Sequence, residues 1–326
     1  MSPETRTNIA ILLATYNGIR FLEAQIRSLK GNLRPFTLHW LDDCSTDGTR
    51  QVVRSLTRDL NIELREWHQG QHLGVPRAFF RLLERVEADI YLFCDQDDIW
   101  QPGKIDATVD NLLPDLASPV LCFSDPLLFD DDVPQVFRRL TEALSLTVPA
   151  AQLTSKAFAI NLASGHTIGF TRPLREIFLQ HRTVAWTYAF MHDWWMYLIA
   201  IASGEVRMLR DVPTTLYRLH ASGTLGSIAR RTGWRNFFPV SERWREVQGD
   251  RRQLALNATG FILASKTLPA AAKLDRMLEL ARLVASIDRR QSPIAFIRLV
   301  RRAVWPQPGF SLFWLTMSCL CCDALL

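Results

Sequence analysis

The first 125 residues alternate short apolar runs with amphipathic stretches, and this alternation constrains the fold more than any other feature. Apolar runs of this length are typical of buried strands, and apolar residues at helical spacing indicate helices packed on one face. We expect strands at Ile9–Thr15, Thr37–Leu41, Ile62–Trp67, Ile90–Cys94 and Val120–Phe123, and helices over Phe21–Lys30, from Thr49, from Pro76 and over Pro102–Leu113. Repeated strand and helix units predict an α/β fold whose mainly parallel, Rossmann-like sheet has helices on both faces.

Charge divides the chain unevenly. Residues 227–326 hold 16 Lys and Arg against 7 Asp and Glu, a net charge of +9, whereas residues 1–226 hold 22 against 26, a net charge of −4. With 326 residues and 48% hydrophobic composition, the chain is long enough to bury a full core. We therefore expect an α/β domain over residues 1–226 and a helical, basic and aromatic C-terminal region over residues 227–326.

The C-terminal region interleaves arginine doublets with tryptophan and phenylalanine, as in Arg230-Arg231 near Trp234. This pattern suits an anionic membrane surface. A nucleic acid is the competing partner, although no recognition motif accompanies the patch, and an ordinary solvated helical face is a third interpretation. The last segment, Gly309–Leu326, is apolar for about 14 residues before Asp323. Because about 20 residues are needed to cross a bilayer, we expect this segment to lie in an interface or to pack as a core helix.

The N-terminus and the cysteines indicate the compartment. Residues 1–8 are polar and lead straight into the first apolar run, without the pattern of a secretory signal. The six cysteines lack the paired spacing of a zinc site. A reduced compartment fits best, so we expect a cytoplasmic protein, peripheral at the inner face of the plasma membrane.

Polar clusters follow three of the predicted strands. Thr15-Tyr16-Asn17-Gly18 follows the first strand, the segment from Asp42 to Thr49 follows the second, and Asp95-Gln96-Asp97-Asp98 follows the fourth. Ligands of open α/β sheets bind beyond the carboxyl ends of the strands, so these clusters are expected to meet in one crevice. The alternative for each cluster is an ordinary turn or a helix N-cap, which Ser, Thr and Asp also favour.

Three carboxylates in four residues, at Asp95, Asp97 and Asp98, predict a cationic partner. Mg²⁺ takes oxygen ligands and is usually held by one or two carboxylates together with substrate phosphates. The chain contains neither a GxxxxGK[ST] nor a GxGxxG phosphate loop. We therefore expect a diphosphate to be bound through Mg²⁺ or Mn²⁺ rather than through a glycine-rich loop.

Three of these segments together resemble the inverting glycosyltransferases of family two, which have the GT-A fold, and most closely the rhamnosyltransferase-like branch. They are TYNG at Thr15–Gly18, DDCSTDGT at Asp42–Thr49 and DQDDIWQPGKI at Asp95–Ile105. The resemblance covers about residues 8–226. It implies transfer of a sugar, with rhamnose as a candidate, from a nucleoside-diphosphate donor to a hydroxyl of a growing cell-surface saccharide or lipid-linked saccharide.

The resemblance also implies roles for single residues. Thr15, Tyr16, Asn17, Asp43 and Asp95 would bind the nucleotide. Asp97 would hold the metal ion, and Asp98 would be a second metal contact or a helix N-cap. Asp193, in the segment Met191-His192-Asp193, would be the catalytic base. Arg218, His220 and His192 would serve the diphosphate or the acceptor, and the segment Gly165-His166-Thr167 would belong to a loop on the acceptor side.

The sequence departs from these relatives at two positions. Gly223 stands where they usually carry Asn three residues after the His, and Ala78 stands where many have Asn. Both changes bear on the contacts with the donor sugar. Two other functions stay open at this point: a nucleotidyltransferase, and a saccharide-binding or scaffold protein that retains the fold without turnover. We do not expect a nucleic-acid partner, because the basic residues lie outside the predicted crevice.

Overall fold

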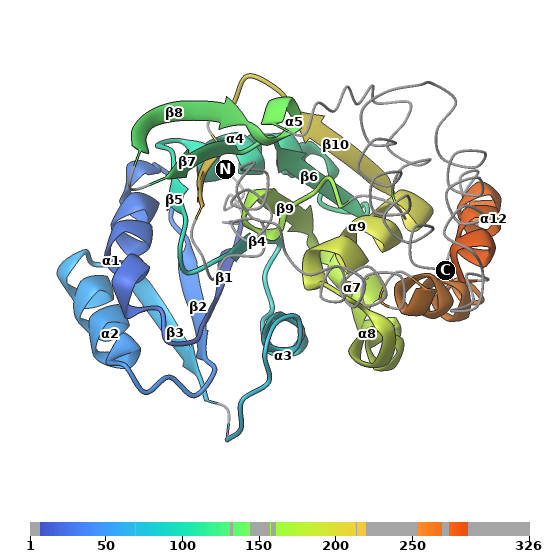
Figure 1. Cartoon of the computed structure of the whole chain (residues 1–326), viewed down its shortest axis with the longest axis horizontal. Coiled ribbons are helices and arrows are strands. Elements are labelled where there is room, and N and C mark those ends of the chain that lie inside the picture. Colours follow the sequence, from blue (N-terminus) through green and yellow to red (C-terminus); the bar gives the residue numbers. More distant parts are fainter. Residues whose placement is uncertain are drawn as a thin grey trace, which may run out of the picture.

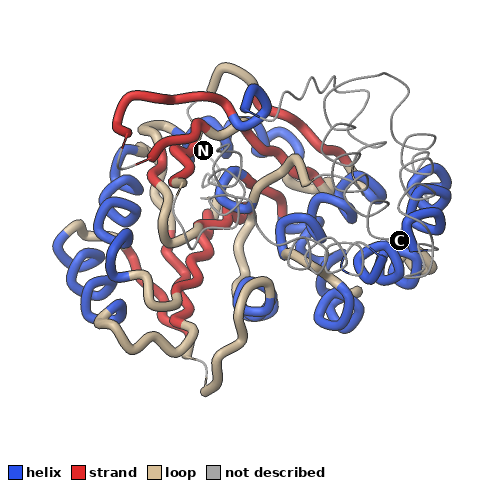
Figure 2. The backbone as a smooth tube through the Cα atoms, viewed as in Figure 1, coloured by secondary structure: helices blue, strands red, loops and turns tan. Residues whose placement is uncertain are grey.

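The computed structural model describes residues 7–68, 70–130, 133–143, 157, 161–212, 214–219, 253, 255–268 and 274–285. A seven-stranded sheet runs through its centre in the order β10-β6-β9-β4-β1-β2-β3 (red in Figure 2). The strands are β1 Ile9–Thr15, β2 Thr37–Asp42, β3 Glu63–Trp67, β4 Ile90–Cys94, β6 Val120–Ser124, β9 Ile168–Thr171 and β10 Glu205–Leu209. The predicted α/β class is confirmed.

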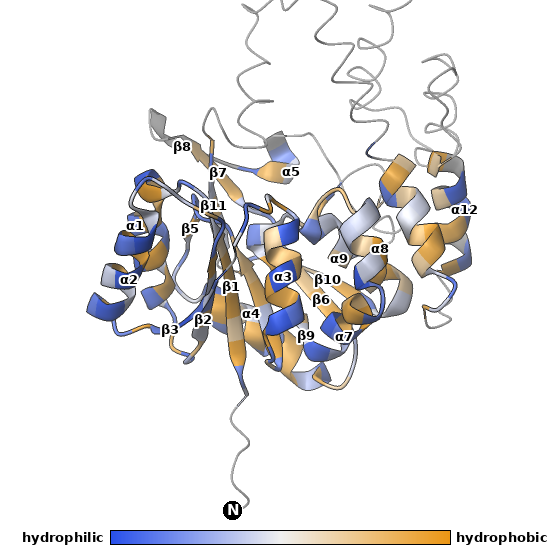
Figure 3. Ribbon diagram, turned by 90° about the horizontal axis from the view of Figure 1, so that it is seen from below, coloured by the Kyte–Doolittle hydropathy of each residue, from blue (hydrophilic) through white to orange (hydrophobic). Residues whose placement is uncertain are grey.

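Helices cover both faces of this sheet (Figure 1). On one face lie α1 Ile19–Ser28, α2 Thr49–Asp59 and α4 Lys104–Leu112, and on the other α3 Arg77–Arg85, α7 Arg172–Gln180 and α9 His192–Ser203. Alternate side chains of a strand point to opposite faces, so Ile11 joins the first layer and Leu12 the second. The apolar colour of the large sheet in Figure 3 reflects its burial between two helical layers.

The sheet is parallel except at one strand. β4, β1, β2 and β3 form a parallel run, and β6 pairs in parallel with β10, as the strand and helix pattern predicts. β9 lies between β4 and β6 and is antiparallel to both. This strand, β10 and the strands of a second sheet were not among the strands that the sequence pattern predicts.

The second sheet has the order β5-β11-β7-β8, and its strands are β5 Ile99–Trp100, β11 Thr215–Arg218, β7 Leu127–Asp130 and β8 Val133–Arg139. β5 follows the acidic segment directly, and Ile99 and Trp100 pair with Leu216 and Thr215 of β11. The segment that contains Arg218 is thus a strand itself rather than a loop after one. This pairing brings residues 95–98 and 215–218 together, although about 120 positions separate them in the chain.

The described helices of the C-terminal region, residues 255–264 and α12 Leu274–Ala285, pack onto the same core as α9. Phe261 and Met277 belong to one apolar cluster with Trp195 of α9. These helices are therefore not separate from the first domain. The predicted boundary at residue 226 and the apolar segment Gly309–Leu326 lie outside the described residues. Within the described part, no helix is both long and apolar enough to cross a membrane.

Leu92 of β4 is fully buried between the two helical layers, and its truncation tests this packing. We expect Leu92→Ala to lower the free energy of unfolding by about 2–5 kcal/mol, since it removes buried methyl groups and leaves a cavity. Leu33 is 95% exposed, so Leu33→Ala is the matched control and should change stability by less than about 0.5 kcal/mol. Urea unfolding measures both, and equal effects would contradict the described core.

Candidate active site

Thr15 is the last residue of β1, and its side chain forms hydrogen bonds inside the protein. The side chain is buried, its Oγ1 donates to Oδ1 of Asp42 at 3.1 Å, and Nε1 of Trp40 donates to the same Oγ1 at 2.9 Å. The backbone O of Thr15 accepts from the N–H of Asp43 at 2.7 Å. The side chain of Thr15 is therefore used inside the protein, and its role in nucleotide binding stays a prediction.

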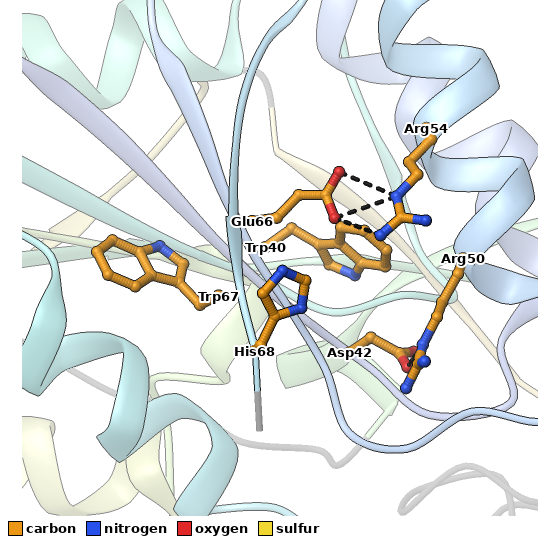
Figure 4. Close-up of a pocket in the computed structure, with 7 residues that line it drawn as sticks. All are labelled: Trp40, Asp42, Arg50, Arg54, Glu66, Trp67 and His68. Carbon is orange, nitrogen blue, oxygen red and sulfur yellow. Dashed lines mark hydrogen bonds and ion pairs between the residues drawn. The ribbon is translucent and has the colours of Figure 1, made fainter. Parts of the chain in front are cut away.

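Asp42 and Asp43 are neighbours at the end of β2 but face different surroundings. Asp42 faces α2, where its Oδ2 accepts from Nε of Arg50 at 2.6 Å. It lines a pocket of about 160 Å³ together with Trp40, Arg50, Arg54, Glu66, Trp67 and His68 (Figure 4). Arg54 donates twice to Glu66 there, so both carboxylates of this pocket are paired with an arginine. These two ion pairs connect α2 with β2 and β3 of the large sheet.

Asp43 closes the loop that follows β3. Its Oδ1 accepts from the N–H of Leu73 and its Oδ2 from the N–H of Gly74, each at 2.7 Å. Gly74 has a φ of +70°, a conformation that favours glycine. The side chain of Asp43 is 4% exposed, and Nδ1 of His72 lies 3.0 Å from its Oδ2. Asp43 thus fixes the loop after β3, whose His72 ring contacts the ring of Tyr16.

Tyr16 and Asn17 lie at the mouth of the crevice. Tyr16 is 47% exposed, and its ring centre lies 4.3 Å from that of His72. Gln96 fixes its backbone, because Oε1 of Gln96 accepts from the N–H of Tyr16 at 2.9 Å. Oδ1 of Asn17 accepts from the N–H of Thr46 at 2.9 Å. The loops after β1, β2 and β4 therefore meet, as the sequence predicts, and Tyr16 keeps an exposed ring for a ligand.

The acidic segment after β4 carries charges that repel one another. Asp95 is half-buried, and its pKa lies well above the ordinary value, first because burial disfavours the charged form and then because Asp97 and Asp193 add negative charge nearby. The start of α9, which carries Asp193, also lies beside the end of β4, because the His192 and Phe93 ring centres are 4.7 Å apart. Among the described residues, no three His, Cys, Asp or Glu side chains are grouped as a metal site.

Asp98 is fully buried and points away from the crevice. Its Oδ1 accepts from the N–H of Arg218 at 3.1 Å, and Nε of Arg218 donates to the backbone O of Asp97 at 2.8 Å. Burial raises the pKa of Asp98 well above its ordinary value. The N-cap role expected for Asp98 is wrong, because the next helix begins at Lys104 after Gly103. The side chain joins the acidic segment to β11.

Asp193 lies in the first turn of α9, and three groups hold its carboxylate. Oδ1 accepts from the N–H of Trp194 at 2.6 Å, Oδ2 accepts from the N–H of Gly165 at 2.8 Å, and the side chain of Asn161 also hydrogen-bonds to it. Burial raises the pKa of Asp193 to about 6, although the hydrogen bonds act in the opposite direction. A carboxylate with this pKa is ionised at neutral pH and is basic enough to accept a proton.

His192 and Arg218 have different surroundings. The His192 ring is 2% exposed, stacks on Phe79 with ring centres 3.9 Å apart, and has a pKa lowered to about 3 by burial. The ring of His192 therefore lies in the aromatic core, and its expected role toward the diphosphate or the acceptor stays a prediction. The guanidinium of Arg218 lies over the Phe129 ring, 4.6 Å from its centre, next to the backbone of Asp97. His220 lies outside the described residues.

Three residues that contact predicted site residues were given no role from the sequence: Gln96, Asn161 and His72. Gln96 stands between two predicted site residues, and that position was the one available signal for it. Asn161 and His72 carry no motif that points to the site. Their partners come from distant elements, so only the folded chain identifies them.

Known proteins resemble this chain in sequence. The model of glycosyl transferase family 2 matches residues 10–125. The chain is 24% identical to the dTDP-rhamnosyl transferase RfbG of Shigella flexneri over 263 residues, 77% of this chain and 86% of that protein. It is 25% identical to the putative teichuronic acid biosynthesis glycosyltransferase TuaG of Bacillus subtilis over 109 residues, 32% of this chain and 42% of that protein.

Two solved structures share the fold. A crystal structure of Staphylococcus aureus TarS residues 1–349 matches with a TM-score of 0.55 at 15% identity, over 91% of this chain and 81% of that one. The mannosyltransferase PcManGT from Pyrobaculum calidifontis, in complex with GDP-Man and Mn²⁺, matches with a TM-score of 0.57 at 17% identity, over 99% of this chain and 82% of that one. The expected GT-A fold is confirmed.

Asp43 is predicted to hold the loop after β3 through two backbone amides. In Asp43→Ala the N–H groups of Leu73 and Gly74 lose their acceptor, so we expect them to exchange with solvent at least about tenfold faster, as for a lost charge-assisted hydrogen bond. Asp59→Ala, at an exposed position of α2, is the control. Hydrogen exchange measured by mass spectrometry gives the rates, and unchanged rates in residues 72–76 would rule out this role.

Proposed function

We propose that this chain, whose residues 10–125 form a glycosyl transferase family 2 domain, is an inverting glycosyltransferase that moves a sugar from a nucleoside-diphosphate donor to a hydroxyl of a cell-surface saccharide. One observation carries the proposal. The His192 ring, next to Asp193 in α9, lies 4.7 Å from the ring of Phe93 in β4, so the segment with Asp193 meets the end of β4, which Asp95 and Asp97 follow, at the carboxyl edge of the sheet, where α/β sheets bind nucleotides.

We infer that the donor is dTDP-rhamnose. The likeness to the dTDP-rhamnosyl transferase RfbG extends over 77% of this chain, well beyond the family domain. Tyr16, with its exposed ring, would stack on the base, while Asn17, Asp43 and Asp95 would line the nucleoside site. Asp43 already accepts from two backbone amides, so a base N–H would add a further donor to a carboxylate that has remaining acceptor capacity.

The residues at this edge suit Mg²⁺ or Mn²⁺. Burial first, and then the negative charges of Asp97 and Asp193, raise the pKa of Asp95, and carboxylate oxygens are the ligands that these hard cations take. We assign the metal to Asp97 and not to Asp98, whose side chain is buried against Arg218. When bound, the ion would offset the charge that develops on the departing diphosphate.

Asp193 would take the proton from the acceptor hydroxyl, and Arg218 would face the leaving group. The amides of Gly165 and Trp194 fix the direction of the Asp193 carboxylate, so its basicity does not depend on a mobile side chain. The Arg218 guanidinium lies among Phe129, Phe21 and the Asp97 backbone, and weak screening in such surroundings strengthens its attraction for an anion. His220 would assist it.

The acceptor is inferred from the same comparisons. RfbG is a rhamnosyl transferase, and TuaG is named for teichuronic acid biosynthesis, so a saccharide or lipid-linked saccharide of the cell surface is the acceptor we propose. The basic and aromatic residues of the C-terminal region would hold the enzyme at the inner face of the plasma membrane, next to a lipid-linked acceptor.

Metal dependence is the first test of this proposal. We expect the purified chain to release dTDP from dTDP-rhamnose with Mn²⁺ or Mg²⁺, and EDTA to abolish the release. Asp97→Asn should lower the affinity for dTDP with Mn²⁺ by about tenfold or more, because a metal ligand is lost, while Asp59→Asn should leave it unchanged. Calorimetry measures the affinity, and activity that persists in EDTA would exclude the metal role.

The pH dependence tests the role of Asp193. Because a general base must be ionised and its pKa is about 6, turnover should be constant above pH 7 and should fall as the pH drops below 6, by about tenfold per pH unit. Asp193→Asn should lower kcat by about 100-fold or more, in the range for general bases, and leave dTDP binding within about threefold. A rate that stays constant down to pH 4.5, or equal losses of kcat and binding, would refute the base.

A further inference from the structure

The turn Gly165–Thr167 lies inside the molecule, next to the end of β4, and the function proposed above uses only the backbone amide of Gly165. All three of its residues are buried, and the turn leads directly into the antiparallel strand β9. Its sequence, Gly-His-Thr, was expected to belong to a loop on the acceptor side. A buried turn of this kind does not offer a surface to an acceptor, so its contacts within the protein indicate what it does.

Gly165 contacts the residue proposed as the base. Its N–H donates to Oδ2 of Asp193 at 2.8 Å. A Cβ atom at this position would lie 2.9 Å from Nε2 of His192, which is too close unless the buried His192 ring moves, and in ordinary contact, at 3.5 Å, with Cβ of Asp193. Glycine therefore allows the turn to approach the start of α9 closely enough for its amide to reach the carboxylate.

His166 contacts the acidic segment from the other side of the turn. Its Nδ1 lies 3.5 Å from Oδ2 of Asp98, and the two side chains are 3% and 1% exposed. At 3.5 Å this is a polar contact longer than an ordinary hydrogen bond, and it joins two buried polar atoms that have no hydrogen-bond partner in the described residues.

The rest of His166 is fixed against β11. The ring stacks on Tyr217 with centres 4.8 Å apart and planes 15° from parallel, and the backbone O accepts from Oγ1 of Thr215 at 2.8 Å. Asp98 in turn accepts from the N–H of Arg218, whose Nε donates to the backbone O of Asp97. The turn thus connects α9, which carries the base, with the strand and the loop that carry the proposed diphosphate and metal residues.

We propose that the turn Gly165–Thr167 is a positioning element that sets the distance between the Asp193 carboxylate and the Asp97–Arg218 side of the site, with Gly165 holding Asp193 and His166 holding Asp98. This inference rests on the proposed function. Transfer needs the base and the leaving-group residues on opposite sides of the reacting carbon, and a misplacement of about 1 Å costs about 100-fold in rate. Neither Gly165 nor His166 needs to touch a substrate for this role.

Two substitutions at His166 separate the role of its ring from the role of its polar contact with Asp98. His166→Phe keeps a flat ring against Tyr217 and removes the nitrogen that faces Asp98. His166→Asn loses the ring but places an amide nitrogen close to the position of Nδ1. A residue that only fills the core would tolerate Phe better than Asn. A residue that holds Asp98 would tolerate Asn better than Phe, and this reversed order is the signature of positioning.

The experiment measures hydrolysis of dTDP-rhamnose with Mn²⁺, dTDP binding by calorimetry, and the melting temperature of each full-length variant. For His166→Phe we expect kcat to fall at least tenfold and the affinity for dTDP with Mn²⁺ to fall less than threefold, because the contacts between Asp98, Arg218 and Asp97 remain. On a logarithmic scale, His166→Asn should regain at least half of the loss in kcat that His166→Phe shows, although its melting temperature should be lower.

His181→Phe is the matched control, since His181 is also buried and its Nε2 also lacks a partner in the described residues, but it lies between α7 and α8. Its kcat should stay within twofold of the wild-type value. A wild-type kcat in His166→Phe, an equal loss in His181→Phe, or no recovery in His166→Asn would overturn the role of the turn and leave the proposed function standing. A wild-type chain that hydrolyses none of dTDP-rhamnose, UDP-GlcNAc and GDP-mannose would overturn the proposed function and the inference with it.

Discussion

Hydrogen bonds from backbone amides to buried carboxylates hold this site together. Asp43 accepts from residues 73 and 74, Asp98 from residue 218, and Asp193 from residues 165 and 194. A buried carboxylate is costly unless donors reach it, and amides of the backbone are donors whose positions the fold itself fixes. Each of these acids therefore draws a distant segment to the crevice edge, so the groups that carry charge also determine the shape of the site.

The same bonds explain why acidity differs between these carboxylates. Asp193 accepts from two amides and a side chain, and burial raises its pKa only to about 6. Asp98 accepts from the backbone N–H of Arg218, and burial together with the nearby charges of Asp97 and Asp95 raises its pKa well above the ordinary value. A group that must lose and gain a proton during turnover needs an environment like that of Asp193. A group that only joins two segments can tolerate an environment like that of Asp98. The roles that we propose for the two residues follow this difference.

The sequence predicts the parallel part of the fold well, because strand and helix periodicities are local. β1, β2, β4 and β6 match their predicted ranges to within a residue, and α3 begins next to Pro76. β9, of four residues, and β5, of two, are too short to show a periodicity, and both owe their existence to partners far away in the chain. A local sequence pattern therefore could not predict where these strands lie. They matter for the site because β5 pairs with the strand of Arg218 and β9 follows the turn of Gly165.

Within the site, the sequence predicts which segments meet but not which way each side chain points. Asp42 and Asp43 are consecutive, so one faces α2 and the other the crevice wall. Thr15 and His192 belong to motifs that resemble the family, yet both side chains are buried by tertiary contacts that no motif specifies. The most direct test of the central claim is a crystal structure of the chain with dTDP and Mn²⁺. We predict an anomalous peak for Mn²⁺ that joins the Asp97 carboxylate to the diphosphate, with Asp98 still bound to the amide of Arg218. A nucleotide away from the carboxyl edge of the sheet, or a metal ion without Asp97, would contradict it.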